Sequence, residues 1–172
     1  MSSYAATGLR TRIRRPHERR QLRTASANGP RAKTARSSFN DPPAEPAGPD
    51  SPRAYLRKAR TFARWMQELR DSGALDSATC MAGATVISAC NAALAFRTGR
   101  KYIAGDEREL VRLVARLESP NAAQRAKQVR AVFSLREIAA RALRSVSPSE
   151  ADRALRAASR VLEQAAAEVL EA

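Results

Sequence analysis

One arginine in the second half of a predicted helix is the residue of this chain best placed to bind a phosphate or carboxylate group. Arg136 lies four residues after Val132 and four before Ala140, in line with the apolar face of that helix. Its side chain either extends along the edge of the core or is held in a groove where the guanidinium binds an anion. Arg141 follows five residues later, about 140° around a regular helix, so we expect that the two arginines do not form one clamp.

Other kinds of catalytic chemistry have few candidate residues in this sequence. The only histidine, His17, lies in the N-terminal segment, which removes histidine-based acid–base catalysis and most metal sites from the folded region. There is no glycine-rich phosphate loop, no nucleophile elbow and no cysteine–histidine cluster. Glu107 and Glu109 are two residues apart and would face different sides of a helix. We therefore expect no metal site and no cofactor, and an ordinary hydrolase is poorly supported.

The charge of the chain points to a partner of opposite sign. The formal net charge is +14 at pH 7. Such a charge suits nucleic acid, an anionic membrane or an acidic partner protein. The alternative is a genome of high GC content, in which arginine and alanine codons are frequent and no polyanion is involved.

Residues 1–52 have the composition of a disordered tail and linker, because they are rich in arginine and proline and poor in apolar residues. Within them, the proline-rich segment 41–49 is expected to be a stiff, extended linker. A nucleic-acid-binding arm would use Arg10, Arg12, Arg14, Arg15, Arg19 and Arg20. The same segment also suits an organelle transit peptide, or an extension without function that results from a misassigned start codon.

A long uncharged stretch lies between Asp76 and Arg97. Its length suits either a membrane span or the central helix of a buried bundle. Alanine dominates over leucine, isoleucine and phenylalanine in this stretch, so the central helix is the better interpretation. We predict this helix over 75–98, with Asn91 hydrogen-bonded inside the bundle.

The two cysteines, Cys80 and Cys90, both fall on this predicted helix. Ten residues correspond to about 15 Å along the helix axis, which is too far for a disulfide bond. We therefore expect a reduced, cytoplasmic protein.

The remaining helices are expected to surround the central one. They are predicted over 52–71, from Asp106 to about Leu117, over 121–144 and over 148–171. The most specific local signal is the sequence Ser147-Pro148-Ser149-Glu150, which is a capping box with proline at the first helical position. No alternating run indicates a strand. The sequence thus predicts an all-α fold, an up-and-down bundle of about five helices over 53–172.

The first of these helices has two distinct faces. Its predicted core residues are Tyr55, Phe62, Met66 and Leu69, with Ala59 between them. Its other face is basic and consists of Arg53, Arg57, Lys58, Arg60 and Arg64.

Residues 69–101 resemble a HEPN domain. In such domains a helix and a short glycine-containing turn precede an Asp-Ser-Ala start to a long, alanine-rich helix, which ends in an Ala-Leu stretch followed by a glycine. Here Asp76-Ser77-Ala78 and Ala93-Leu94 fall at that spacing, whereas Gly83-Ala84 replaces the aromatic pair often found in that helix. The resemblance continues weakly over roughly 53–170 and does not include the tail.

The resemblance implies an activity and a partner. Many HEPN domains resemble RNases in which an arginine is followed, four to six residues later, by a histidine, and two copies meet across a dimer interface. Arg136 is the counterpart of that arginine, but residues 141–143 are Arg, Ala and Leu, so the histidine that would act as general acid or base is missing. The resemblance also implies a homodimer and, because such domains are often encoded beside small nucleotidyltransferases in toxin–antitoxin pairs, a nucleotidyltransferase-type partner.

Our leading hypothesis is a non-catalytic, HEPN-like module that binds RNA or a partner protein, with Arg136 and Arg141 in contact with the RNA. One alternative is a divergent, metal-independent RNase in which the same two arginines act in catalysis. The other alternative is a structural or interaction bundle whose basic tail binds DNA. An RNA cleavage assay separates the first two, and salt-dependent binding of duplex DNA with and without the tail tests the third.

Overall fold

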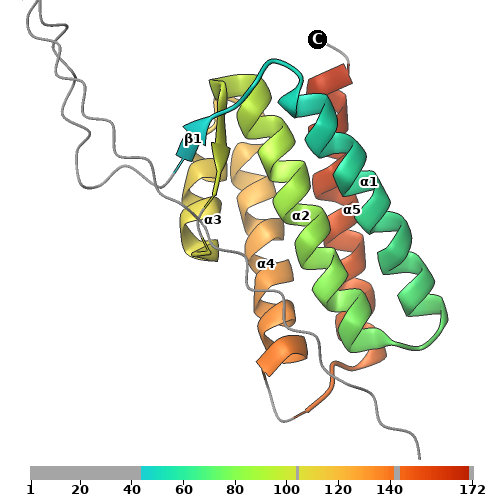
Figure 1. Ribbon diagram of the computed structural model, residues 1–172. Coiled ribbons are helices and arrows are strands. Elements are labelled where there is room, and N and C mark those ends of the chain that lie inside the picture. The colour runs from blue at the N-terminus through green and yellow to red at the C-terminus, as the bar shows by residue number, and fades with distance from the viewer. Residues whose placement is uncertain (1–43, 104, 142–143, 171–172) are drawn as a thin grey trace, which may run out of the picture. The chain divides into compact units, whose positions relative to one another are not determined.

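The structure is a computed structural model that describes residues 44–103, 105–141 and 144–170 (Figure 1). Its helices are α1 (Ser51–Asp71), α2 (Leu75–Thr98), α3 (Glu107–Ala115), α4 (Ala122–Arg141) and α5 (Pro148–Leu170), and its strands are β1 (Ala44–Pro46) and β2 (Arg100–Tyr102). In Figure 1, α1, α2, α4 and α5 alternate in direction, and the short α3 lies beside α4. The predicted all-α, up-and-down bundle of about five helices is therefore confirmed over the described residues.

Helix α2 is the central element and packs against α1, α4 and α5. Six of its fourteen buried positions are alanines, and Ala78, Ala82, Ala89 and Ala93 among them are fully enclosed. Because a methyl group is the whole side chain at these positions, the neighbouring helices can approach closely. By length and composition α2 could cross a membrane, but 72% of its most apolar window is buried inside the chain. Such extensive burial is typical of the core helix of a bundle, which is what the sequence predicts for this segment.

The core face of α1 differs from the predicted one. Leu56, Ala59 and Met66 are its buried residues. Tyr55 and Phe62, which the sequence predicts in the core, are only half-buried. The predicted and the observed core faces both contain Ala59 and Met66 and differ only by a small rotation around the helix axis. Periodicity alone does not decide between two such faces.

The two short strands contradict the expectation of a chain without strands. β1 lies inside the predicted linker 41–49, and it pairs antiparallel with β2 so that Ala44 is opposite Tyr102. Strands of three residues are too short to show alternation, and their pairing joins distant segments. The folded part therefore begins before the predicted boundary at residue 53. Residues 1–43, with all six arginines of the predicted arm, lie outside the described residues.

Asn91 holds β2 against α2. The backbone N–H of Tyr102 donates to Asn91 Oδ1 at 2.7 Å, and Asn91 Nδ2 donates to the Tyr102 carbonyl at 3.3 Å. The prediction that Asn91 is hydrogen-bonded inside the bundle is confirmed, and its partner is the backbone of a strand. The Tyr102 hydroxyl in turn donates to the carbonyl of Asp106 at 2.6 Å, which fixes the start of α3. Burial, followed by the nearby charge of Asp106, raises the pKa of Tyr102 to about 12.

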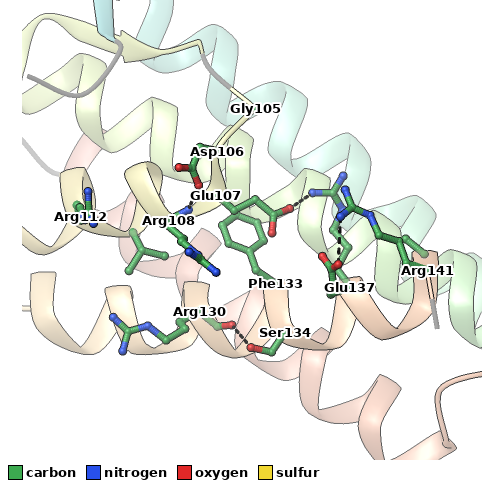
Figure 2. Close-up of a pocket in the computed structure, with 13 residues that line it drawn as sticks. Gly105, Asp106, Glu107, Arg108, Arg112, Arg130, Phe133, Ser134, Glu137 and Arg141 are labelled. Carbon is green, nitrogen blue, oxygen red and sulfur yellow. Dashed lines mark hydrogen bonds and ion pairs between the residues drawn. The ribbon is translucent and has the colours of Figure 1, made fainter. Parts of the chain in front are cut away.

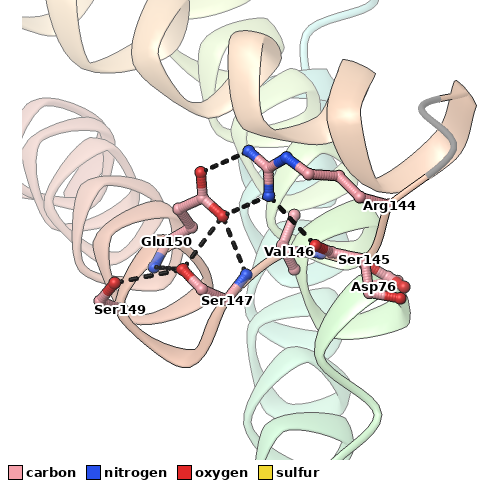
Figure 3. Close-up of polar contacts among 7 residues, drawn as sticks. All are labelled: Asp76, Arg144, Ser145, Val146, Ser147, Ser149 and Glu150. Carbon is pink, nitrogen blue, oxygen red and sulfur yellow. Dashed lines mark hydrogen bonds and ion pairs between the residues drawn. The ribbon is translucent and has the colours of Figure 1, made fainter.

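The capping box at the start of α5 forms as the sequence predicts (Figure 3). The Glu150 N–H donates to Ser147 Oγ at 3.3 Å, and the Ser147 N–H donates to Glu150 Oε2 at 2.9 Å. Arg144 adds two hydrogen bonds to the same carboxylate, at 2.9 and 2.8 Å. Hydrogen bonds from Arg144 and then from Ser147 lower the pKa of Glu150 to about 2. The preceding helix α4 ends at Arg141, before the predicted end at residue 144.

Candidate nucleic-acid interface

A groove of about 910 Å³ lies between α3 and α4 and is lined mainly by charged side chains (Figure 2). We call it the α3–α4 groove. Its basic residues are Arg108, Arg112, Arg130, Arg136 and Arg141, and its acidic residues are Asp106, Glu107 and Glu137. Five positive and three negative groups leave a formal charge of +2 on the lining. The groove therefore offers both cationic groups for an anion and carboxylates that compete with that anion.

Local interactions at the N-terminus of α3 position the acidic side of the groove. Asp106 is the N-cap, and its Oδ1 accepts a hydrogen bond from the Arg108 N–H at 2.9 Å. Glu107 and Glu109 follow in the first turn, where negative charge is stabilised by the helix dipole. The hydrogen bond from Tyr102 anchors this end of α3 to β2, so Glu107 is held facing α4.

Arg136 lines the groove, and its stem passes over Gly83 of α2. A Cβ atom placed on Gly83 would overlap Arg136 Cδ, so the absence of a side chain at Gly83 makes room for the arginine. The guanidinium forms an ion pair with Glu107, and both side chains remain about one-third exposed. The two alternatives left open by the sequence are thus combined in one residue. Its stem packs at the edge of the core while its charged end lies in a groove.

Arg141 lines the same groove, which differs from the expectation that helical rotation separates it from Arg136. Arg141 Nη1 donates to Glu137 Oε1 at 3.1 Å, one turn earlier on α4. This i, i+4 pairing directs the long side chain back along the helix toward the groove. The 140° rotation describes the Cα positions, whereas the reach of the side chain decides where the charge lies.

Three further arginines of the groove, Arg108, Arg112 and Arg130, are not singled out by the sequence. Arg112 pairs with Glu109, but within the described part of the chain neither Arg108 nor Arg130 forms an ion pair. One signal that could have found Arg130 is its helical register. It precedes Ser134, Glu137 and Arg141 by four, seven and eleven residues, the spacing of a single face of α4.

A second polar cluster lies inside the bundle, where the sequence indicates none. Arg125 of α4 is 0% exposed and forms an ion pair with Glu168 of α5. Glu168 also accepts hydrogen bonds from Ser119 at 2.5 Å and from Arg97 at 3.3 Å. Arg125 Nε donates to Gln164 at 3.4 Å, while Arg125 Nη1 has no hydrogen-bond partner among the described residues.

The pKa values of two groups in and beside this cluster, Glu168 and Cys90, are shifted. Burial by itself would raise the pKa of Glu168, but the hydrogen bonds from Arg125 and Ser119 outweigh it and lower the pKa. Burial raises the pKa of Cys90 to about 12, although the nearby charge of Arg125 acts in the opposite direction. Because Arg125 is fully enclosed, it joins α4 to α5 inside the bundle and cannot contact a ligand in solvent.

The role of the groove is indicated neither by a metal site among the described residues nor by similarity to a known protein. Within the described ranges, no group of three His, Cys, Asp or Glu side chains could hold a metal ion. His17 lies outside those ranges. No protein-family model matches the chain, and no curated protein sequence matches it.

Proposed function

We propose that this protein is a non-catalytic, HEPN-like helical module that binds RNA through the α3–α4 groove. The observation that supports this most directly is the gathering of five arginines from two helices around one groove. Arg108 and Arg130 are the two whose charge is not neutralised by an ion pair in the described structure. Guanidinium groups bind phosphate in a planar, bidentate geometry. Phosphate contacts supply most of the affinity of a protein for nucleic acid.

The role proposed for Arg136 follows from its ion pair with Glu107. A guanidinium has five N–H donors, and Arg136 uses one of them for Glu107. A phosphate of the RNA would take the remaining donors or displace the carboxylate. Arg141 likewise uses one of its donors for Glu137. In this proposal Arg108 and Arg130 make the first contacts, and Arg136 and Arg141 add contacts as their acidic partners are displaced.

The chemistry of the groove favours binding over cleavage. A metal-independent RNase needs a group that accepts the proton of the 2′-hydroxyl, and arginine stays protonated and cannot serve. Of the three groove carboxylates, Glu107 and Glu137 are each engaged by an arginine, and Asp106 caps α3 by accepting a hydrogen bond from the Arg108 N–H. We therefore keep the divergent RNase as the alternative hypothesis, which the experiment described next distinguishes from the binding module.

The test measures RNA binding by the full-length protein and by three single variants. Arg130→Gln and Arg136→Met each remove one charge from the groove, and methionine keeps much of the stem packing over Gly83. Arg153→Gln removes an exposed charge on α5, outside the groove, and is the matched control. Fluorescence anisotropy of a labelled single-stranded RNA gives the affinity at several salt concentrations, and a denaturing gel shows whether the RNA stays intact.

We expect each groove variant to bind more weakly than the control, with the slope of log K against log salt reduced by about 0.7. The RNA should remain uncut by the wild-type protein. If both groove variants match Arg153→Gln in affinity and slope, the groove does not bind RNA. If the wild-type protein cuts RNA and Arg136→Met does not, the divergent RNase takes the place of the binding module.

Two further expectations belong to the proposal: a homodimer, which the resemblance to HEPN domains implies, and a cytoplasmic location, which the two free cysteines Cys80 and Cys90 favour. Light scattering over a range of protein concentrations tests the first, because a mass that stays at that of one chain excludes the dimer for the isolated protein. Location is tested by fractionating the cells in which the protein occurs.

A further inference from the structure

The outer face of α1 carries a second basic surface that the α3–α4 groove does not include. Arg53, Arg57, Arg60 and Arg64 are all exposed, and we call them the α1 arginine stripe. At 100° per residue, their spacing of four, three and four places them within about 60° of one another around the helix. They extend over about 16 Å along its axis. The four arginines thus form a straight row of positive charge.

Within the described structure, acidic side chains neutralise little of the positive charge of this row. Arg64 is 3.8 Å from Glu68, and both side chains are more than 60% exposed, so this pair holds its partners weakly. Arg53, Arg57 and Arg60 form no ion pair with any described residue. The contrast with the α3–α4 groove is clear, because there three of the five arginines are paired with carboxylates.

An exposed aromatic side chain lies next to the stripe. Trp65 is 44% exposed and follows Arg64, about 100° further around the helix. Its ring is supported by Phe62, with 5.7 Å between the ring centroids, and Lys58 lies 5.6 Å from the centre of the Phe62 ring. A large flat ring held in solvent beside a row of cations is the arrangement by which proteins bind single strands, because phosphates contact the cations and an unpaired base stacks on the ring.

We propose that the outer face of α1 binds single-stranded nucleic acid, with the α1 arginine stripe along the phosphates and Trp65 stacked on a base. A small anion would need convergent donors, whereas these arginines are spread along the helix. A membrane surface would need a free apolar face, but Leu56, Ala59 and Met66 are buried in the bundle. Duplex nucleic acid would leave Trp65 without an unpaired base.

This proposal does not depend on the α3–α4 groove. Figure 1 shows α1 and α3 on opposite sides of α2, so the two surfaces face different directions. Each can therefore fail in an experiment while the other holds.

Trp65 is the single tryptophan of the chain, so its fluorescence reports on this surface without a label. The probe is an oligouridylate of about 12 nucleotides, titrated into the full-length protein. Stacking should quench Trp65 saturably. The quenching should persist in Arg130→Gln, because that substitution lies in the groove. Anionic lipid vesicles of phosphatidylglycerol and phosphatidylcholine are titrated in parallel.

Two variants of the surface are compared with Arg153→Gln by anisotropy of the labelled oligouridylate. Arg57→Gln/Arg60→Gln should reduce the salt slope by about 1.4 more than the control does. Trp65→Leu should weaken binding by about 5- to 140-fold, since it removes the stacking ring and no charge.

Three results would overturn the proposal. The first is unchanged Trp65 fluorescence at saturating oligouridylate, which would place any binding elsewhere. The second is equal affinity and slope in Arg57→Gln/Arg60→Gln and in the control. The third is a blue shift of Trp65 with the vesicles and none of the expected quenching with oligouridylate, which would assign the surface to a membrane.

Discussion

Replacing Glu168 by glutamine tests the idea that a buried ion pair joins α4 to α5. The substitution keeps the size of the side chain and one acceptor oxygen, but it removes the charge opposite Arg125. Arg125 is 0% exposed and already has one nitrogen without a partner among the described residues. The charge of Arg125 would then be enclosed without a counter-ion, and it cannot reach water without disturbing the packing.

Removing one partner of a buried pair costs about 3–5 kcal/mol of unfolding free energy. Glutamine still accepts a hydrogen bond, so we expect Glu168→Gln to lie at the lower end, about 3 kcal/mol. For a folded part of this size the corresponding fall in melting temperature is roughly 10–15 °C. Urea unfolding followed by circular dichroism gives the free energy, and a thermal scan gives the melting temperature.

Two further variants make the test specific. Glu163→Gln changes an exposed glutamate on the same helix and should alter stability by no more than about 0.5 kcal/mol. Arg125→Met/Glu168→Gln removes both charges and should recover most of the loss, because no charge is then buried alone. If Glu168→Gln is as stable as Glu163→Gln, the reasoning about the buried pair is wrong.

The same carboxylate predicts how stability depends on pH. The pKa of Glu168 is lowered in the folded protein from 4.5, so its contribution is complete above that value and is lost as the pH falls through the folded pKa. Unfolding free energy measured from pH 7 downward should therefore fall more steeply in the wild-type protein than in Glu168→Gln below about pH 4.5. Equal slopes in that range would contradict the shift.

Three other substitutions or reactions test the groove and the core. Glu107→Gln frees Arg136 from its ion pair, so RNA should bind more tightly and the salt slope should rise by about 0.7; unchanged binding would show that Arg136 makes no phosphate contact. Gly83→Ala should raise stability more in an Arg136→Ala background than in the wild-type protein, because the added Cβ overlaps the arginine stem; equal effects in urea unfolding would contradict that contact. A thiol reagent at pH 8 should modify the half-buried Cys80 well before Cys90, which is buried and has a pKa of about 12; simultaneous modification would show that the core opens readily.

The sequence by itself determined the features that depend on neighbours within about one helical turn. The limits of α2 agree with the prediction of 75–98, because the uncharged stretch is long and Gly99 ends it in a left-handed conformation with φ of 64°. The capping box at Ser147 and Glu150 forms as predicted, since all of its donors and acceptors lie within four residues. The number of helices followed from the same local signals.

Only the tertiary structure decided which charged groups meet. Glu107 and Arg136 are 29 residues apart, and Arg125 and Glu168 are 43 apart. Nothing in the local pattern around Arg125 indicates burial, because its helix carries charged residues at many positions and its enclosure depends on how α5 packs. The short strands β1 and β2 are likewise set by pairing across the chain. A sequence specifies such contacts through the packing of whole elements, so the charges that form the groove, and those that are neutralised there, become apparent only when α3, α4 and α5 are in place around α2.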